Sequence, residues 1–210
     1  TSMAPSPIVA IGASHASVQL ATSLRQAGYS GDIVIVGAEP HLPYHRPPLS
    51  KTLLTQQISF DKTLLRQQSF YGKHNIQLKL GARVKSISRE CSQVTLDSGE
   101  TISYSKLVIA TGADPIVLNL PGEQLEGIGY LRNYDDTQSL MPYIKEGKSA
   151  VVVGGGYIGL ETAAALRKAG MVVTVLEGMA RVLQRVTSPE ISAFYTKAHV
   201  TRGVNIVTNA

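Results

Sequence analysis

The sequence predicts an α/β fold of two tandem Rossmann-like units, because one order of segments occurs twice in its 210 residues. The order is an apolar strand, a tight turn of small residues, a helix, a second apolar strand and an acidic residue. One copy begins near residue 8 and the other near residue 151. Between them, short alternating segments predict a small antiparallel β-meander.

The second copy has the clearer turn. The apolar strand Val151–Val153 leads to glycines at Gly154, Gly156 and Gly159, and a helix pattern begins at once. This is the G-x-G-x-x-G spacing of a dinucleotide site. The first glycine permits a tight turn, the second lets the backbone approach a pyrophosphate, and the third lets helix and strand pack closely. The N–H groups and dipole of the helix N-terminus favour the pyrophosphate there.

An acidic residue follows the next strand of this copy. The strand Val172–Leu176 ends at Glu177, about 20 residues past the glycines, where a carboxylate can bind the ribose 2′-hydroxyl of NAD. A carboxylate there repels the 2′-phosphate of NADP, so the sequence predicts a preference for NADH over NADPH. The alternative is a turn between strand and helix that binds nothing, which the combination of strand, glycines and acid disfavours.

The first copy keeps the layout but loses two glycines. The strand Ile8–Ile11 meets Gly12, and Ser14 and Ser17 stand where the second and third glycines would be. Serine is small, and its hydroxyl could donate to a phosphate oxygen, although its Cβ intrudes at the closest backbone approach. Glu39 lies about 22 residues past Ser17, a spacing suited to an adenosine ribose. The layout therefore predicts a second nucleotide site.

A proline-rich segment, Pro40–Lys51, follows the first copy. Its prolines fix φ and remove backbone donors, which predicts a stiff, extended stretch with a helical start after Pro48. A rigid segment that presents Arg46 and Lys51 is a candidate ligand wall. The alternative is an ordinary surface loop.

The middle of the chain separates two domains. Gln77–Tyr104 is expected to form the antiparallel meander, and Leu107–Ala110 another buried strand. A connector rich in proline and glycine follows, which places the domains at residues 1–114 and 115–210. A helix is expected over about Asp135–Lys145.

Composition excludes several classes of function. Hydrophobic residues make up 43% of the chain, its net charge is +5, and Cys91 is its one cysteine. A disulfide framework or a paired redox motif within the chain is therefore excluded, and the histidine spacing predicts no metal site. No basic cluster interleaved with aromatics predicts nucleic-acid binding. The single cysteine suits a reducing cytosol, so a cytoplasmic location is expected, and no apolar run predicts a membrane span.

Three stretches together resemble a known family. Arg46–Lys51, Ala110–Gly112 and Gly154–Glu161 resemble the FAD-dependent pyridine-nucleotide oxidoreductases, a superfamily that includes disulfide reductases. The nearest branch is the NADH-dependent ferredoxin reductases of the putidaredoxin reductase type, which includes the reductase components of ring dioxygenases. The likeness runs from Ile8 to Val207. It implies units with three ββα layers, and a chain from which the C-terminal part of the family fold is absent.

The resemblance implies a function and its cofactors. Residues 1–114 would bind FAD and residues 115–210 would bind NAD(H). Electrons would pass from NADH through FAD to a [2Fe–2S] ferredoxin, which would feed a cytochrome P450 or a ring-hydroxylating dioxygenase. Two alternatives stay open: a flavin NADH oxidase or disulfide reductase, and a truncated, redox-silent nucleotide-binding module. The lone cysteine argues against disulfide chemistry.

The resemblance also implies roles for individual residues. Lys51 would lie beside the isoalloxazine ring and favour the anionic reduced flavin, and Glu161 would hold that lysine. Glu161 as an ordinary first-turn acid, and Tyr157 or His15 as simple packing residues, are the alternatives. The FAD site would be formed by Gly12, Ser14, His15, Ala16, Ser17, Glu39, Arg46, Lys51, Val84, Ala110, Thr111, Gly112 and Arg132. The NADH site would be formed by Gly154, Gly156, Tyr157, Ile158, Gly159 and Glu177.

Overall fold

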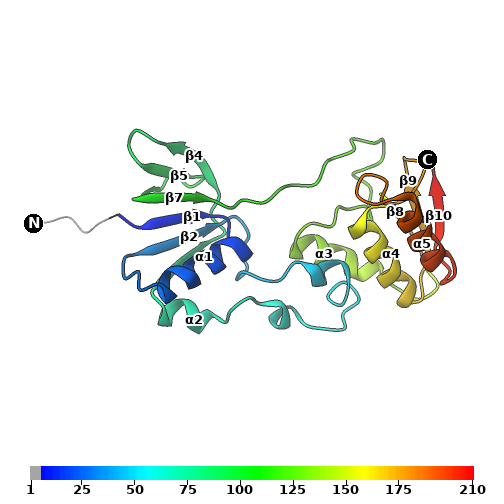
Figure 1. Cartoon of the computed structure of the whole chain (residues 1–210), viewed down its shortest axis with the longest axis horizontal. Helices are drawn as coiled ribbons and strands as arrows, with labels where there is room; N and C mark the ends of the chain where they lie inside the picture. Colours follow the sequence, from blue (N-terminus) through cyan, green and yellow to red (C-terminus); the bar gives the residue numbers. More distant parts are fainter. Residues whose placement is uncertain (1–5) are drawn as a thin grey trace, which may run out of the picture. The chain divides into compact units, whose positions relative to one another are not determined.

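The computed structural model describes residues 6–210, which form two compact units (Figure 1). Unit 1 comprises the residues up to His45 together with Asp61–Asp114, and unit 2 comprises Arg46–Phe60 together with Pro115–Ala210. Along the chain, unit 1 ends at Asp114 and unit 2 continues from Pro115. The segment Arg46–Phe60, expected in the N-terminal domain, groups with unit 2.

Unit 1 is built on a parallel sheet of four strands in the order β3-β2-β1-β7. Every residue of β2 is buried, as expected for a parallel strand covered on both faces. Because β2 and β3 follow β1 on one side and β7 returns on its other side, the strand order reverses between β1 and β7. The strands are β1 (Ile8–Ile11), β2 (Ile33–Gly37), β3 (Ile76–Leu80) and β7 (Lys106–Ile109).

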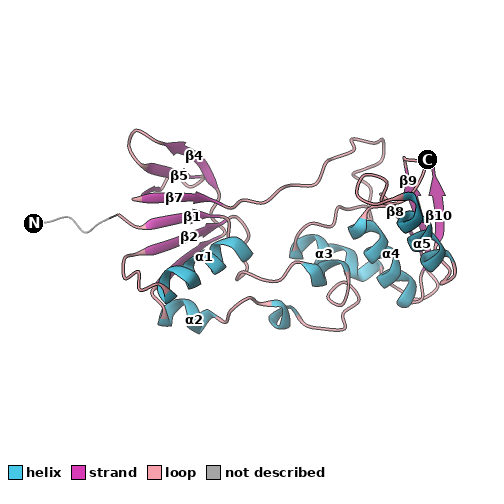
Figure 2. Cartoon of the chain, viewed as in Figure 1, coloured by secondary structure: helices cyan, strands magenta, loops and turns pink. Residues whose placement is uncertain are grey.

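Helices cover one face of this sheet and a β-meander covers the other (Figure 2). Helices α1 (His15–Gln26) and α2 (Gln68–Lys73) pack on a core that includes Ile33 and Ile35. On the opposite face, Val9, Ile11, Val34 and Val36 pack against Val94 and Leu96 of the meander. The antiparallel meander consists of β4 (Val84–Ser88), β5 (Gln93–Leu96) and β6 (Thr101–Ser103).

The expected meander over Gln77–Tyr104 is wrong in its first strand. β3 pairs in parallel with β2, with Ile76 opposite Ile33, and so belongs to the main sheet. Helix α2 supplies the crossover that a parallel pair requires. β3 is an edge strand in which Ile76 is buried, Gln77 is exposed and the other residues are half-buried, so its sequence alternates like that of a meander strand.

Unit 2 contains a parallel sheet of three strands in the order β10-β9-β8. Buried side chains of β9 and of the helix after the glycine turn, among them Val173, Val175 and Ala163, form its core. The elements are α3 (Tyr134–Leu140), β8 (Ser149–Val153), α4 (Tyr157–Lys168), β9 (Val172–Glu177), α5 (Pro189–Val200) and β10 (Asn205–Thr208). The tandem Rossmann-like fold predicted from the sequence is confirmed.

The helix expected over Asp135–Lys145 is shorter than predicted. Asn133 and Asp136 form a capping box that starts α3 at Tyr134. After Leu140 the chain tightens into a 3-10 turn that contains Pro142. Proline has no N–H to donate to the preceding helical turn, which accounts for the early end.

The segment Arg46–Phe60 docks on unit 2 through apolar anchors. Leu49, Leu53 and Leu54 are only 5%, 2% and 1% exposed, and Leu54 belongs to the core cluster of α4 and β9. The Phe60 ring stacks on Tyr134, with 4.0 Å between ring centroids. The proline-rich motif is therefore packed against the C-terminal unit and is not an ordinary surface loop.

Candidate functional site

The three glycines of the second turn occupy three different environments. Gly154 has φ 112°, and its N–H donates to the Leu176 carbonyl at 2.8 Å, which fixes the turn to β9. A Cβ added to Gly156 would meet no atom within 4 Å, whereas one added to Gly159 would lie 1.9 Å from the Gly154 carbonyl oxygen. The middle position is therefore open to a ligand, and the last is closed by packing of helix on strand.

Glu177 lies against the glycine turn. Its carboxylate accepts a hydrogen bond from the Gly155 N–H at 2.7 Å and another from the Met179 N–H at 2.8 Å. The acid at the end of β9 is thus held at the turn itself. Gly156 is the N-cap residue of helix α4 and has no side chain to accept a hydrogen bond, so no side-chain cap covers the first N–H groups of the helix.

The first turn has similar geometry with tighter support. Gly12 has φ 108°, and its N–H donates to the Val36 carbonyl at 2.7 Å. A Cβ on Gly12 would lie 2.1 Å from the Ala110 carbonyl oxygen, in the segment that follows β7. Thr111 and Gly112 are exposed just beyond it. These residues lie at the carboxyl ends of β1 and β7, where the strand order reverses and α/β sheets bind ligands.

The two serines of the first turn differ in exposure. Ser14 is half-buried at the start of α1 and makes no side-chain cap. Ser17 is 1% exposed, and its hydroxyl has no hydrogen-bond partner among the described residues. The Ser17 side chain therefore takes the packing position of the third glycine and is covered from solvent, while the adjacent His15 and Ala16 are exposed.

Side chains from the following loop connect to this turn in unit 1. The Tyr44 hydroxyl donates to the Glu39 carboxylate at 2.5 Å, and the His15 and His45 rings lie 3.1 Å apart between Nε2 and Nδ1. Val84 begins β4 opposite Leu96, next to a register shift.

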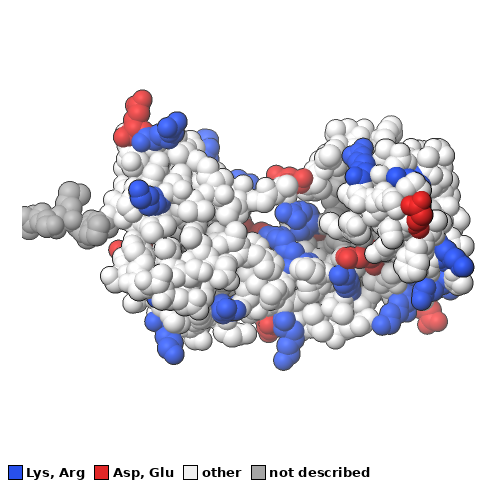
Figure 3. Space-filling view, viewed as in Figure 1, with Lys and Arg blue, Asp and Glu red and all other residues white. Residues whose placement is uncertain are grey.

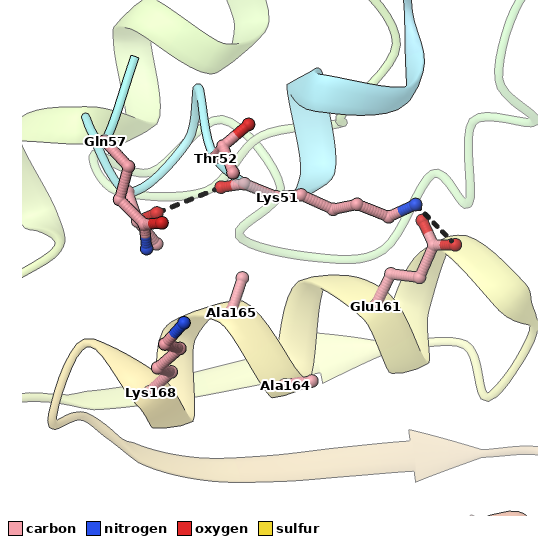
Figure 4. Close-up of a pocket in the computed structure, with 8 residues that line it drawn as sticks. Lys51, Thr52, Gln57, Glu161, Ala164, Ala165 and Lys168 are labelled. Carbon is pink, nitrogen blue, oxygen red and sulfur yellow. Dashed lines mark hydrogen bonds and ion pairs between the residues drawn. The ribbon is translucent and has the colours of Figure 1, made fainter.

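Unit 2 brings together the cationic residues that the resemblance assigned to FAD. Lys51 Nζ lies 3.1 Å from Glu161 Oε1, on the second turn of α4 (Figure 4). Arg46 donates to the Arg132 carbonyl at 3.2 Å. Sequence reasoning missed Ser50, which donates to Glu161 Oε2 at 3.0 Å. Its only sequence signal is its place beside Lys51.

A cavity of about 280 Å³ lies between α4 and the segment from Lys51 to Gln57. The Lys51 and Glu161 side chains meet across it at one end, as Figure 4 shows. Tyr157 and Ile158, at the start of α4, are 49% and 56% exposed and are therefore accessible to a ligand at the glycine turn. The cavity is lined by Lys51, Thr52, Thr55, Gln57, Glu161, Ala164, Ala165 and Lys168.

Residues 6–210 contain no cluster of metal-ligating side chains and no helix that could span a membrane, and their one cysteine is free. Within them, no three or more His, Cys, Asp or Glu side chains are grouped so as to hold a metal ion. Cys91 is exposed in the turn before β5. On the face shown in Figure 3, Lys and Arg side chains stand in separate small groups. No helix within the described range has the length and hydropathy needed to span a membrane.

Two glycine turns, each between a parallel strand and a helix, characterise this chain, and a comparison of its sequence with known protein families identifies the family to which it belongs. The model of the pyridine nucleotide-disulphide oxidoreductase family matches residues 6–210. The chain belongs to this family. The predicted relation to its ferredoxin reductase branch is also confirmed by the relatives that the chain matches.

Two curated relatives show how much of the family fold is covered. A ferredoxin–NAD(P)(+) reductase from Sphingomonas sp. is 40% identical over 199 residues, which are 95% of this chain and 48% of the relative. Putidaredoxin reductase from Pseudomonas putida is 40% identical over 204 residues, 96% of this chain and 48% of the relative. The chain therefore spans about half the length of the curated relatives it matches.

A solved structure is similar to this chain in both fold and sequence. In the crystal structure of the covalent putidaredoxin reductase–putidaredoxin complex, the matched chain is 40% identical and superimposes with a TM-score of 0.94. The match covers 99% of this chain and 50% of that chain.

Proposed function

We propose that this chain is part of a flavoprotein that carries electrons from NADH through FAD to a [2Fe–2S] ferredoxin. The observation that carries the proposal is the arrangement on α4. One helix begins at an open glycine turn with Glu177 beside it, and on its second turn Glu161 holds the Lys51 ammonium. A nucleotide turn and a lysine–carboxylate pair are thus fixed on the same rigid element.

The turn of unit 2 fits the pyrophosphate and ribose of NADH. Gly156 leaves room for close approach, and the N-terminus of α4 favours the negative charge of the pyrophosphate. Glu177 already stands at the turn and can accept a hydrogen bond from a ribose hydroxyl. Its charge would repel a 2′-phosphate, so NADH is preferred over NADPH.

The first turn fits the ADP part of FAD. Gly12 provides the left-handed turn, the exposed start of α1 faces it, and Glu39 lies at the end of the second strand. FAD, when bound, accepts hydride from NADH and releases single electrons. Lys51 would place positive charge near the ring that gains negative charge, and Glu161 would hold that charge in position. Arg46 and Arg132, which contact each other, would add to the same positive region.

The names of the relatives support the choice of electron acceptor. They include rhodocoxin reductase and the reductase component of an anthranilate 1,2-dioxygenase system, 41% and 39% identical to this chain. We therefore assign a small iron–sulfur protein as the partner. That protein would supply a cytochrome P450 or a ring-hydroxylating dioxygenase in the cytoplasm. Disulfide reduction is disfavoured because the only cysteine, Cys91, is exposed in the meander of unit 1.

Spectroscopy with added cofactors tests this function. The chain, mixed with FAD and freed of excess, should show bound-flavin absorbance that NADH bleaches in the absence of air, and added ferredoxin should then reduce cytochrome c. Rapid oxygen consumption without ferredoxin would favour an NADH oxidase. A colourless protein that fails to bind NADH would favour a redox-silent module.

A further inference from the structure

Two neighbouring residues hold the two oxygens of one carboxylate. Ser50 Oγ donates to Glu161 Oε2 at 3.0 Å, while Lys51 Nζ lies 3.1 Å from Glu161 Oε1. The serine is 5% exposed, whereas the side chains of Lys51 and Glu161 are 47% and 38% exposed. The contact between Ser50 and Glu161 is therefore the protected half of the arrangement.

The hydroxyl proton of Ser50 has two possible acceptors. The Pro47 carbonyl oxygen lies 3.4 Å from Ser50 Oγ, farther than the Glu161 oxygen. A hydroxyl donates a single proton, and a bond to an ionised acceptor is stronger than one to a neutral carbonyl. The proton therefore belongs to the carboxylate.

The backbone of the proline-rich motif fixes Ser50. Pro47 to Ser50 form a 3-10 turn, closed by a bond from the Lys51 N–H to the Pro48 carbonyl at 3.1 Å. The buried Leu49 within the turn and the buried Leu53 after it flank Ser50 and anchor it. Lys51 instead extends a flexible four-carbon stem that loses much rotamer freedom when it is held in one place. Of the two residues that hold Glu161, Ser50 is the rigid one.

We propose that Ser50 is a positioning residue, which fixes the Glu161 carboxylate so that its other oxygen holds the Lys51 ammonium in one place. The effect of this positioning on flavin reduction by NADH rests on the proposed function, in which Lys51 faces the flavin. Without the hydroxyl, the Glu161 side chain is free to leave the rotamer that meets Lys51, and the ammonium then samples a larger volume.

Acylation of lysine amines tests the positioning without any cofactor. The 210-residue chain is treated briefly with an acetylating reagent, and each lysine is quantified by mass spectrometry. Ser50→Ala should raise the labelling of Lys51 about three-fold, because a charged hydrogen bond no longer restrains its partner. Glu161→Gln sets the upper limit. Lys79, paired with Glu100 in unit 1, is the internal reference.

A second buried hydroxyl provides the matched control. Thr137 is 0% exposed, and its hydroxyl oxygen lies 3.2 Å from the Asn133 carbonyl oxygen and 3.4 Å from that of Leu49, so it borders the same motif but bonds to backbone carbonyls rather than to Glu161. Thr137→Val should leave Lys51 labelling unchanged. Ser50→Thr keeps the hydroxyl and should therefore show the wild-type level of Lys51 labelling. Equal labelling in Ser50→Ala and wild type, or an equal rise in Thr137→Val, would overturn the proposal. If Ser50→Ala fails to fold by circular dichroism, Ser50→Cys, a weak donor of similar size, replaces it.

A kinetic measurement connects the positioning to the reaction. With FAD bound, Ser50→Ala should slow anaerobic flavin reduction by NADH about five-fold and change the NADH dissociation constant less than two-fold, because the lost interaction acts on the reacting state. Thr137→Val should change neither. An unaltered reduction rate in Ser50→Ala would reject the role in the reaction. If labelling responds as expected but the chain binds neither FAD nor NADH, the positioning stands and the proposed function fails.

Discussion

Val9 and Val151 occupy matching positions in the two copies of the first strand, three residues before Gly12 and Gly154, yet Val9 is 0% and Val151 63% exposed. In unit 1 the meander covers the face of the sheet that carries Val9. In the described part of unit 2, no comparable layer covers Val151 or Val153, which is 60% exposed. The strand–turn–helix repeat thus determines the turn and the helical layer on one face of the sheet. Whether the other face is buried depends on a separate segment, which in unit 1 is the β-meander.

The same pair of units differs in how the first glycine is supported. In unit 1, β7 lies beside β1, and its continuation brings the Ala110 carbonyl against Gly12. In unit 2, β8 is an edge strand among the described residues, and space beside Gly154 is open to at least 4 Å. A neighbouring parallel strand therefore adds a steric constraint to a position that is otherwise constrained only by its φ angle.

A third difference concerns the contact between the residue after the first glycine of each turn and the neighbouring strand, β2 or β9. By register, Gly37 in β2 matches Glu177 in β9, and Ala13 matches Gly155. A Cβ on Gly37 would lie 2.4 Å from the Ala13 Cβ. In each unit, one member of the pair is glycine and makes room for the side chain of the other. The acid of unit 1, Glu39, lies two residues past the position that matches Glu177.

The largest expected effect comes from replacing the first glycine of each turn by alanine. Gly12→Ala should destabilise unit 1 by about 4 kcal/mol, because a positive φ and a clash with the Ala110 carbonyl both oppose it. Gly154→Ala meets only the φ strain and should cost about 2 kcal/mol. Hydrogen exchange of the β1 and β8 amides measures each unit separately. If Gly12→Ala and Gly154→Ala destabilised their units equally, the Ala110 carbonyl would not constrain Gly12 beyond its φ angle.

A smaller effect follows from removing the matched valines. Val9→Ala leaves a cavity between sheet and meander and should cost about 3 kcal/mol. Val151→Ala removes an exposed side chain and should change stability by less than about 0.5 kcal/mol. Urea unfolding followed by exchange in each unit is the measurement. If Val151→Ala proved as costly as Val9→Ala, the face of β8 would be buried in solution, for example by self-association.

Sequence patterns predicted the local parts of this arrangement and missed those that depend on distant packing. The Gly154 turn and strands β1, β2, β8 and β9 follow from periodicity and glycine spacing, which are local. β3 was misassigned because a half-buried edge strand alternates like a meander strand. The docking of Arg46–Phe60 on unit 2 depends on Leu49 and Leu54 finding a surface that lies about a hundred residues away in the sequence, and no local pattern contains that information.

The core of unit 1 contains a buried phenol that should make it sensitive to alkaline pH. Burial raises the pKa of Tyr71 to about 12, partly opposed by the charge of Arg66, and its hydroxyl has no partner within residues 6–210. Above pH 10 the unfolded chain loses this proton first, so stability falls as pH rises toward 12. The loss should reach about 2 kcal/mol by pH 11.5.

Tyr71→Phe should remove this loss and leave stability near pH 8 equal to or above that of the wild type, because no hydrogen bond is given up. Urea midpoints measured from pH 8 to 11.5 for both proteins test the expectation. Parallel curves for the two proteins would mean that Tyr71 reaches solvent.

The smallest expected effect separates the two acids. Glu177→Gln removes the charge and gives up the bond from the Met179 N–H, but its one oxygen can still accept from the Gly155 N–H. The turn should therefore remain folded while the preference for NADH over NADPH falls about ten-fold, or about 1.4 kcal/mol. Glu39→Gln is the matched control in unit 1, where the acid bonds to Tyr44 and lies two residues beyond the matching register. It should weaken FAD binding and leave the nicotinamide preference intact. Titration of NADH and NADPH against each variant decides the point, because an unchanged preference in Glu177→Gln would show that the carboxylate only holds the turn.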